Sequence, residues 1–211
     1  MRTLSSDEFF ALAEVKPTTF RAAISRREAV FMAGLDRMLA GGTFLDLDAV
    51  AWKLTDELAP ALTRKVAAVL LKGFNDQWCA AVSKADQIAE PTFLVALERG
   101  QVLEEVELYG QSRKGLGLRE AVNISYGTMR ELGEFDHNKA TTIPDRMTLI
   151  NVTSLLARVR DRAKVIGIDL SAPFLPPLGD PSFEQMLAEV KTFRENLVTR
   201  VRFPRQAERP E

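Results

Sequence analysis

Apolar positions in the first thirty residues recur with the period of two short α-helices. Ser5 and Glu8 have the spacing of a capping box, in which each side chain satisfies a free backbone donor of the other residue. Leu4 before the cap and Phe9 after it are placed for a hydrophobic staple. The first helix then carries one apolar stripe at helical spacing: Phe9, Leu12 and Ala13, with Phe10 at its edge.

A second short helix is predicted directly after Pro17. Proline disfavours helical geometry at the residue before it but suits the first turn of a new helix. Phe20, Ala23 and Ile24 then form an i, i+3, i+4 face for packing. Residues 5–27 therefore predict two short helices joined by a tight turn.

Helical spacing continues to Gly41–Gly42, which break it. The β-branched and aromatic Thr43–Leu45 predicts a brief strand or an extended link. Asp46 or Asp48 can cap the next helix, and Pro60 opens a longer one. The apolar stripe of that longer helix is wide enough to pack against the domain or against a second copy: Leu62, Val66, Val69, Leu70, Phe74, Trp78 and Val82.

Strand signals replace helical ones after Pro91. Two apolar arms, residues 92–98 and 101–109, flank Arg99–Gly100 and predict a β-hairpin. Residues 118–142 do not favour one type of element over another. The predicted hairpin is acidic, and its carboxylates are Glu98, Glu104, Glu105 and Glu107. Their spacing fits no calcium-binding loop, so we interpret them as a solvated face of the hairpin.

Helical signals return at Thr148–Ile166 and end at Gly167, a residue type suited to the end of a helix. A stiff connector rich in proline follows, and Pro181 then begins a last amphipathic helix. The connector prolines are Pro173, Pro176 and Pro177. The apolar face of the last helix is Phe183, Leu187, Val190, Phe193 and Leu197.

These patterns predict a mainly α fold with a small β-hairpin, divided into four segments. Residues 1–60 are expected to form a helix-turn-helix domain, and residues 61–90 a connecting or dimerisation helix. Residues 91–199 are expected to form an α+β region for dimerisation, sensing or partner binding. Residues 200–211 form a basic tail.

Composition narrows the class of protein. The chain has 28 basic and 29 acidic side chains, which excludes histone-like binding by bulk charge but allows a local basic patch. The longest apolar run of the central helical stretch, Val66–Leu71, is far too short to span a bilayer. The first eight residues turn acidic where a signal peptide would turn apolar, so we expect a cytoplasmic protein that does not enter the membrane.

Catalytic and metal-binding signals are weak. One histidine and one cysteine cannot complete a Cys/His zinc site within one chain, and Cys79 beside Trp78 is expected to be a core thiol. His137 lies near Asp136 and Asp145, where an acid/base or metal role competes with the favoured interpretation as a polar loop residue. No nucleophile-elbow, zinc-protease or phosphate-loop motif is present, so we predict no enzyme, no cofactor and no metal.

The most informative surface is the second helix. Residues 16–27 contain four cations and no carboxylate, and a helical wheel places Thr18, Ala22 and Ser25 outward between Arg21 and Arg26. Small side chains edged by arginines suit the major groove, and threonines at a helix start can bond phosphate or a base edge. Exposed arginines on a helical bundle are also often merely solvated, and that alternative stays open. The predicted DNA-binding residues are Lys16, Thr18, Thr19, Arg21, Ala22, Ser25, Arg26 and Arg27.

The segment Ala11–Arg21 resembles the MerR-like winged helix-turn-helix proteins, in which a short helix and a tight turn lead into a recognition helix with a threonine-hydrophobic-arginine motif. Here that motif is Thr19-Phe20-Arg21. The segment Gly41–Val50 resembles the glycine-aromatic wing and the acidic helix start of the same family. The resemblance implies a winged helix-turn-helix domain that reads double-stranded DNA. Such small domains usually act in pairs.

Two functions remain in competition. The first is a sequence-specific DNA-binding protein, a homodimeric transcriptional regulator or an accessory factor of a mobile element, paired through the stripe of residues 62–82 or the last helix. The second is a protein-interaction module without DNA binding, an adaptor or antiactivator. It would act through the acidic hairpin or the last helix within residues 91–199.

Overall fold

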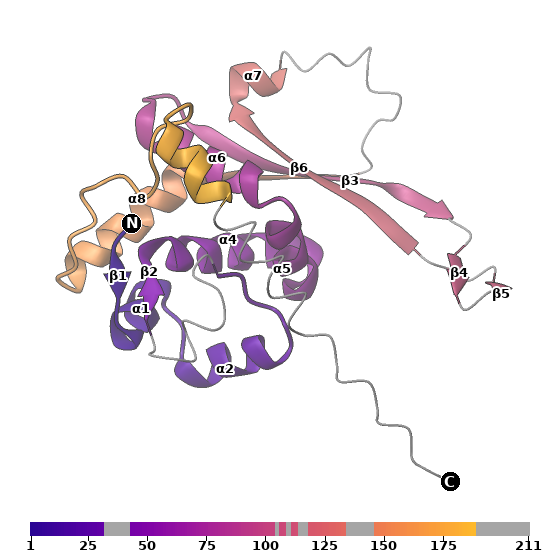
Figure 1. The fold of residues 1–211 in the computed structure, drawn as a ribbon, viewed down its shortest axis with the longest axis horizontal. Helices are drawn as coiled ribbons and strands as arrows, with labels where there is room; N and C mark the ends of the chain where they lie inside the picture. Colours follow the sequence, from indigo (N-terminus) through magenta and orange to yellow (C-terminus); the bar gives the residue numbers. More distant parts are fainter. Residues whose placement is uncertain (32–42, 104–105, 109–110, 114–117, 134–145, 189–211) are drawn as a thin grey trace, which may run out of the picture.

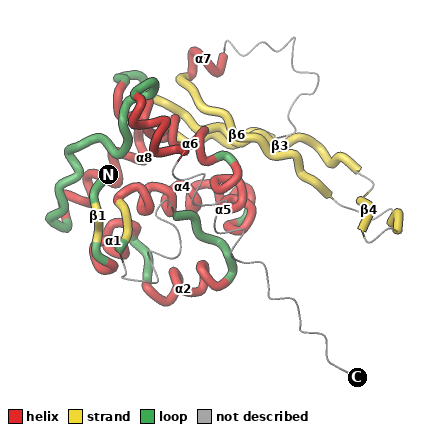
Figure 2. Tube along the Cα trace, in the orientation of Figure 1, coloured by secondary structure: helices red, strands yellow, loops and turns green. Residues whose placement is uncertain are grey.

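The fold is α+β, with a mainly helical body packed against an antiparallel sheet (Figure 1). The computed structural model describes residues 1–31, 43–103, 106–108, 111–113, 118–133 and 146–188; of residues 97–123 it describes the backbone of the strands only. Figure 2 shows the helices gathered on one side, while two long strands extend past them as a ribbon. None of the described helices combines the length and hydropathy that a membrane span requires.

The N-terminal helices form where the sequence predicts them. In α1 (Ser6–Ala13) the capping box is confirmed, since the Glu8 amide donates to Ser5 Oγ at 3.3 Å and the Ser5 amide donates to Glu8 Oε2 at 2.7 Å. The helix ends at Glu14, whose φ of 54° lies in the left-handed region. Pro17 then opens α2 (Pro17–Ser25) in its first turn, as expected.

An aromatic cluster fixes these helices to the rest of the chain. Phe44 lies in β2 (Phe44–Leu45), which pairs antiparallel with β1 (Thr3–Leu4). Its ring stacks on Phe9 with centroids 4.0 Å apart and an angle of 8° between the planes. Phe20 of α2 meets Phe9, Phe44 and Trp52 at 5.3–5.6 Å, so its ring joins α2 to the same cluster.

The segment that resembles a wing has a structural place in this cluster. Of the two alternatives predicted for residues 43–45, a brief strand forms at Phe44–Leu45; it pairs with β1, and Phe44 is buried. Gly41–Gly42 lie outside the described residues. Within the described chain, Phe44 thus belongs to the core, and Leu45 lies half-buried beside it.

The central helices correct one prediction. Pro60 does not open a long helix, because it lies in the last turn of α4 (Asp46–Leu62). The chain leaves the helix at Thr63, where a φ of 67° interrupts it, and the Thr63 hydroxyl then accepts from the Val66 amide at the start of α5 (Arg64–Gly73). A further helix, α6 (Asn75–Gln87), follows Phe74.

The expected pairing stripe of residues 62–82 is therefore divided between helices, and most of it faces inward. Leu62, Leu70, Trp78 and Val82 are buried in the core of the same chain. Val69, in contrast, is 59% exposed. A single dimerisation helix over residues 61–90 is thus not formed, because this stretch covers the chain's own core.

The sheet corrects the predicted hairpin. β3 (Thr92–Leu103) runs through Arg99–Gly100 without turning, and its pairing with β6 (Leu118–Thr128) shifts register between Arg99 and Val102. A bulge absorbs this irregularity, so no turn is needed there. The short hairpin lies further along, between β4 (Val106–Leu108) and β5 (Gln111–Arg113). The carboxylates of Glu98, Glu104, Glu105 and Glu107 lie outside the described side chains.

The third strand occupies the start of a predicted helix. β7 (Arg146–Asn151) pairs with β3, giving the strand order β6-β3-β7. The helix expected from Thr148 instead begins later, as α8 (Val152–Val165), because Asn151 Oδ1 accepts from the Ser154 amide at 2.8 Å and caps it there. The ambiguous segment contributes β6 and the short α7 (Met129–Gly133).

The C-terminal described residues close the core. Gly167 has the expected role at the end of α8, with a φ of +76° and the Ile168 amide donating to the Ala163 carbonyl at 2.8 Å. Residues 181–188 are helical, as predicted from Pro181, and bury Phe183 and Met186. Val190, Phe193, Leu197 and the tail 200–211 lie outside the described residues.

One buried cluster contains side chains from all the main described segments. It includes Phe9 and Phe44 from the front, Trp78 from α6, Leu94 from β3 and Leu155 from α8. The helices α6 and α8 lie between the sheet and the N-terminal helices, and both contact β3. The N-terminal helices therefore share one hydrophobic core with α6, β3 and α8.

Truncation of Phe44 tests whether the aromatic cluster holds this front part together. We expect Phe44→Ala to lower the free energy of unfolding by about 3–5 kcal/mol, because it removes a buried ring and leaves a cavity. Chemical denaturation followed by circular dichroism measures the change. Val69→Ala, at an exposed position, is the control and should change it by less than about 0.5 kcal/mol. Equal effects of the two substitutions would contradict the central place given to the Phe9–Phe44 stack.

Candidate nucleic-acid interface

The second helix presents one face to solvent and the opposite face to the core. Phe20 and Ala23 are buried, and Ile24 is half-buried. Thr18, Arg21 and Ser25 lie on the opposite side, where each is exposed. In Figure 1, α2 lies at the end of the helical body that is distant from the sheet.

All but one of the predicted DNA-binding residues are exposed to solvent in the structure. Ala22 is half-buried rather than exposed, although it belongs to the same stripe as Thr18 and Ser25. The others are exposed: Lys16, Thr18, Thr19, Arg21, Ser25, Arg26 and Arg27. Their placement agrees with the helical wheel because the inward side is fixed by Phe20 and Ala23.

The positive charge of this surface is not neutralised by the described part of the chain. Within residues whose placement the structure gives, no carboxylate lies at ion-pair distance from Lys16, Arg21, Arg26 or Arg27. The preceding carboxylate, Glu14, points to α4 instead and meets Lys53 Nζ at 2.6 Å. That hydrogen bond lowers the pKa of Glu14 below its usual value.

The start of α2 offers backbone donors as well. Lys16 supplies no side-chain cap, and Pro17 has no amide hydrogen. The first intrahelical bond comes from the Phe20 amide, which donates to the Lys16 carbonyl at 3.0 Å. The amides of Thr18 and Thr19 thus have no acceptor among the described residues. They lie at the N-terminus of α2, which is the positive end of the helix dipole.

Both ends of α2 are held in place. The ring of Phe20 anchors the first half in the aromatic cluster. At the other end, Arg27 has a φ of 60°, and the Glu28 amide donates to the Ala23 carbonyl at 2.8 Å. This is the geometry of a helix C-terminus that usually uses glycine, and it turns the chain back toward the buried Ala29 and Val30.

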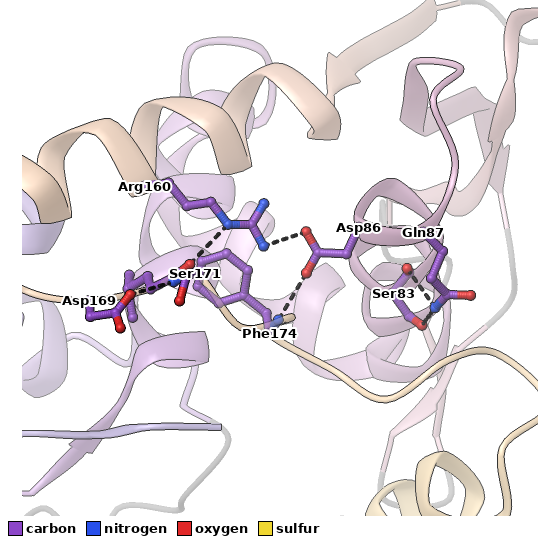
Figure 3. Close-up of polar contacts among 8 residues, drawn as sticks. Ser83, Asp86, Gln87, Arg160, Asp169, Ser171 and Phe174 are labelled. Atoms are coloured by element: carbon purple, nitrogen blue, oxygen red, sulfur yellow. Dashed lines mark hydrogen bonds and ion pairs between the residues drawn. The ribbon is translucent and has the colours of Figure 1, made fainter.

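A second polar cluster is structural. The side chain of Asp86 in α6 is only 1% exposed. Its carboxylate accepts hydrogen bonds from Arg160 of α8 at 2.6 Å and from the Phe174 amide at 2.8 Å (Figure 3). Arg160 Nε also donates to the Leu170 carbonyl at 3.2 Å, and its guanidinium lies 4.8 Å from the centre of the Phe174 ring. Both carboxylate oxygens are thus occupied, so this cluster fastens the proline connector to α6 and α8.

The remaining sequence candidates give no site among the residues that the structure describes. Cys79 is buried in α6, as expected for a core thiol. His137, Asp136 and Asp145 lie outside the described residues. Over the part of the chain that is described, no three His, Cys, Asp or Glu side chains gather closely enough to hold a metal ion.

One cluster of charged side chains at the surface was not predicted from the sequence. Lys53 of α4 and Arg162 of α8 meet Glu14 at the end of α1, whereas Arg158 of α8 pairs with Glu57; these side chains line a cavity of about 260 Å³. The only sequence signal was helical spacing: Arg158 and Arg162 are four residues apart, which places them on one face of α8. Nothing in the sequence indicates that this face meets α1.

Comparison with known proteins adds no family. No family model, curated protein or solved structure matches this chain.

Removal of Asp86 tests the structural assignment of the buried cluster. We expect Asp86→Ala to destabilise the fold by about 3 kcal/mol, because it leaves Arg160 and the Phe174 amide without their partner. Urea denaturation measures the loss. The control is Asp161→Ala, which removes the exposed pair with Lys164 and should cost about 0.5 kcal/mol or less. An Asp86→Ala protein as stable as the control would show that the cluster does not hold the connector.

Proposed function

We propose that this protein binds double-stranded DNA in a sequence-specific manner and reads the major groove with α2. It would act as a regulator of transcription or as an accessory factor of a mobile element. The observation that carries the proposal is the exposed face of α2, with small side chains, four cations at residues 16–27 and no described carboxylate against them. In this proposal α1, the turn at Glu14–Lys16 and α2 form a helix-turn-helix of the kind that the MerR-like resemblance implies.

The dimensions of α2 suit the groove. An α-helix with its side chains is about 10–12 Å in diameter, which fits the major groove of about 12 Å width. The nine residues of α2, at about 1.5 Å per residue, give it a length of roughly 13 Å. Thr18, Ala22 and Ser25 are short enough to let the helix approach the base edges closely. Arg21 lies beside them and is long enough to reach the paired acceptors of a guanine.

Phosphate contacts have donors at the start of α2. Thr18 and Thr19 are exposed, their amides have no acceptor among the described residues, and the helix dipole favours an anion there. Lys16 precedes them as an exposed cation. Such contacts position a protein on DNA without selecting the sequence, whereas Arg21 would supply the selection.

One short recognition helix gives little affinity, so we propose that the protein binds as a homodimer. The stripe of residues 62–82 is mostly occupied by the core and is a poor pairing surface. Met147 and Leu149 are better placed, because they are 57% and 40% exposed on β7, which pairs only with β3 among the described strands. A second copy would pair along that edge of the sheet.

Arginine and lysine substitutions in and before α2 separate base reading from phosphate binding. Duplexes are first selected from a randomised pool with the wild-type protein, and affinity is then measured by fluorescence anisotropy for a selected and a scrambled duplex across a series of salt concentrations. We expect Arg21→Ala to lose about 1–3 kcal/mol of preference for the selected duplex. Lys16→Ala should weaken both duplexes alike and reduce the salt slope by about one.

The matched control is Arg130→Ala, which removes an exposed arginine of α7, distant from α2 in Figure 1. It should leave affinity, preference and salt slope unchanged. The proposal is wrong if the pool yields no enriched sequence, or if the variants at residues 16 and 21 bind like this control.

The protein-interaction module stays as a second candidate, because Met147 and Leu149 are exposed apolar side chains on an edge strand. A stoichiometric protein partner recovered by wild type and lost with Leu149→Lys, together with no retention on heparin, would favour it over DNA binding. A dimer in light-scattering measurements that Leu149→Lys converts to a monomer, with DNA binding weakened in parallel, would favour the first function.

A further inference from the structure

The helices α1, α2 and α8 end in the same way. The residue after the last turn has a φ of 54° at Glu14, 60° at Arg27 and 76° at Gly167. In each case the next amide donates to the carbonyl five residues before it. Glycine is the usual residue at such an ending, because it has no Cβ. Of the three helices, α8 has glycine there, whereas α1 and α2 have charged residues.

The ending of α2 matches that of α8 bond for bond. The Arg27 amide donates to the Ile24 carbonyl at 2.9 Å, and the Glu28 amide donates to the Ala23 carbonyl at 2.8 Å. In α8 the same two bonds measure 3.2 Å and 2.8 Å, with Gly167 in place of Arg27. The backbone at position 27 is therefore one that suits glycine.

Arginine at this position strains the fold. In the left-handed region the Cβ of any residue other than glycine crowds the following carbonyl oxygen. A cation near the end of a helix interacts favourably with the helix dipole, but at an exposed position this gain is smaller than the strain. Arg26, one residue earlier, supplies such a cation in any case. The stability of the fold thus does not explain Arg27.

Contacts within the chain do not explain Arg27 either. At the end of α1, the charged side chain of Glu14 has a partner, since it accepts from Lys53 at 2.6 Å. Arg27 is exposed, and within the described ranges no acceptor, carboxylate or aromatic ring contacts its guanidinium. The partner that this side chain serves must therefore be sought outside the described chain.

We propose that Arg27 contacts a backbone phosphate of bound DNA, an inference that rests on the proposed function of α2. A guanidinium forms strong charge-assisted hydrogen bonds with phosphate oxygens. Arg27 lies two positions beyond the last residue of α2, outside the stripe of Thr18, Ala22 and Ser25. It is therefore assigned to the phosphates beside the groove, while Arg21 and the stripe face the base edges.

This contact gives α2 a phosphate anchor at each end. Lys16 precedes the first turn and Arg27 follows the last, on either side of a helix of roughly 13 Å. Successive phosphates of one strand are about 3.4 Å apart along the duplex axis, so the two cations reach different phosphates. Two separate anchors fix the direction of a recognition helix in the groove, which one anchor does not.

Arg27→Gly tests the inference, because it removes the strain and the charge together. We expect Tm, measured by circular dichroism, to rise by about 2–4 °C. Affinity for the selected duplex, measured by fluorescence anisotropy, should fall about three- to tenfold, and the salt slope should decrease by about one. Opposite changes in stability and affinity distinguish a DNA contact from damage to the fold, which would lower both.

Two variants serve as controls. Arg27→Lys keeps both the charge and the strain, so it should bind the duplex within about twofold of wild type, with an unchanged salt slope and Tm. Gly167→Arg makes the reverse change at the end of α8, where a Cβ would meet no atom within 4 Å. It should lower Tm by about 2–4 °C through backbone strain alone and leave DNA affinity unchanged.

Duplexes with a single neutral methylphosphonate linkage locate the contact. At the phosphate bound by Arg27, the neutral linkage should weaken wild-type binding about three- to tenfold and leave the affinity of Arg27→Gly unchanged. The same scan with Lys16→Ala should identify a different phosphate, because that residue lies at the other end of α2.

The inference is overturned if Arg27→Gly binds the selected duplex like wild type, or if it is less stable than wild type. It is also overturned if no single linkage loses its effect in Arg27→Gly. These outcomes leave the proposed function standing, since the duplex is still bound. Failure to enrich any duplex from the random pool is a different result, and it would remove the proposed function together with this contact.

Discussion

The stack of Phe9 on Phe44 is the contact on which the N-terminal part of the structure depends. It joins α1 to a strand thirty-five residues later and lies beside the small β1–β2 ladder. The ring of Phe20 rests on both, so the position of α2 follows from this stack. A helix of nine residues would be marginal in isolation, and its exposed face keeps its shape only because the other face is bound to this cluster.

Ionic and polar contacts then divide into two kinds by their burial. Asp86 and Arg160 hold the proline connector from within, where the Asp86 side chain is only 1% exposed. The groups around Glu14 lie at the surface, where pairs form and separate with little change in stability. The first kind fixes the architecture, whereas the second contributes little to its stability.

Local signals in the sequence predicted local structure well. The capping box at Ser5, the break at Pro17 and the inward residues of α2 depend on neighbours within one or two turns, and each is found as expected. The turn predicted at Arg99–Gly100 does not form. The same residue types are also compatible with a bulge inside a continuous strand, and a bulge is what β3 has there. The strand at Thr148 was missed because its partner, β3, lies some fifty residues away. The exposure of Arg21 and Arg26 was predictable from the wheel, but the cavity beside Glu14 was not, since three distant helices build it.

The Asp86 cluster also sets how the chain can be divided. The backbone amide of Phe174 completes the shell of a carboxylate that lies in α6, eighty-eight positions earlier. A fragment that ended after α6 would keep that buried acid and lose both of its donors, together with the apolar side chains of β3 and α8 that complete the core. The segment of α1 and α2 is therefore not a module that can be excised for study or grafted elsewhere. It exists as the outer edge of a structure that the last third of the polypeptide makes stable.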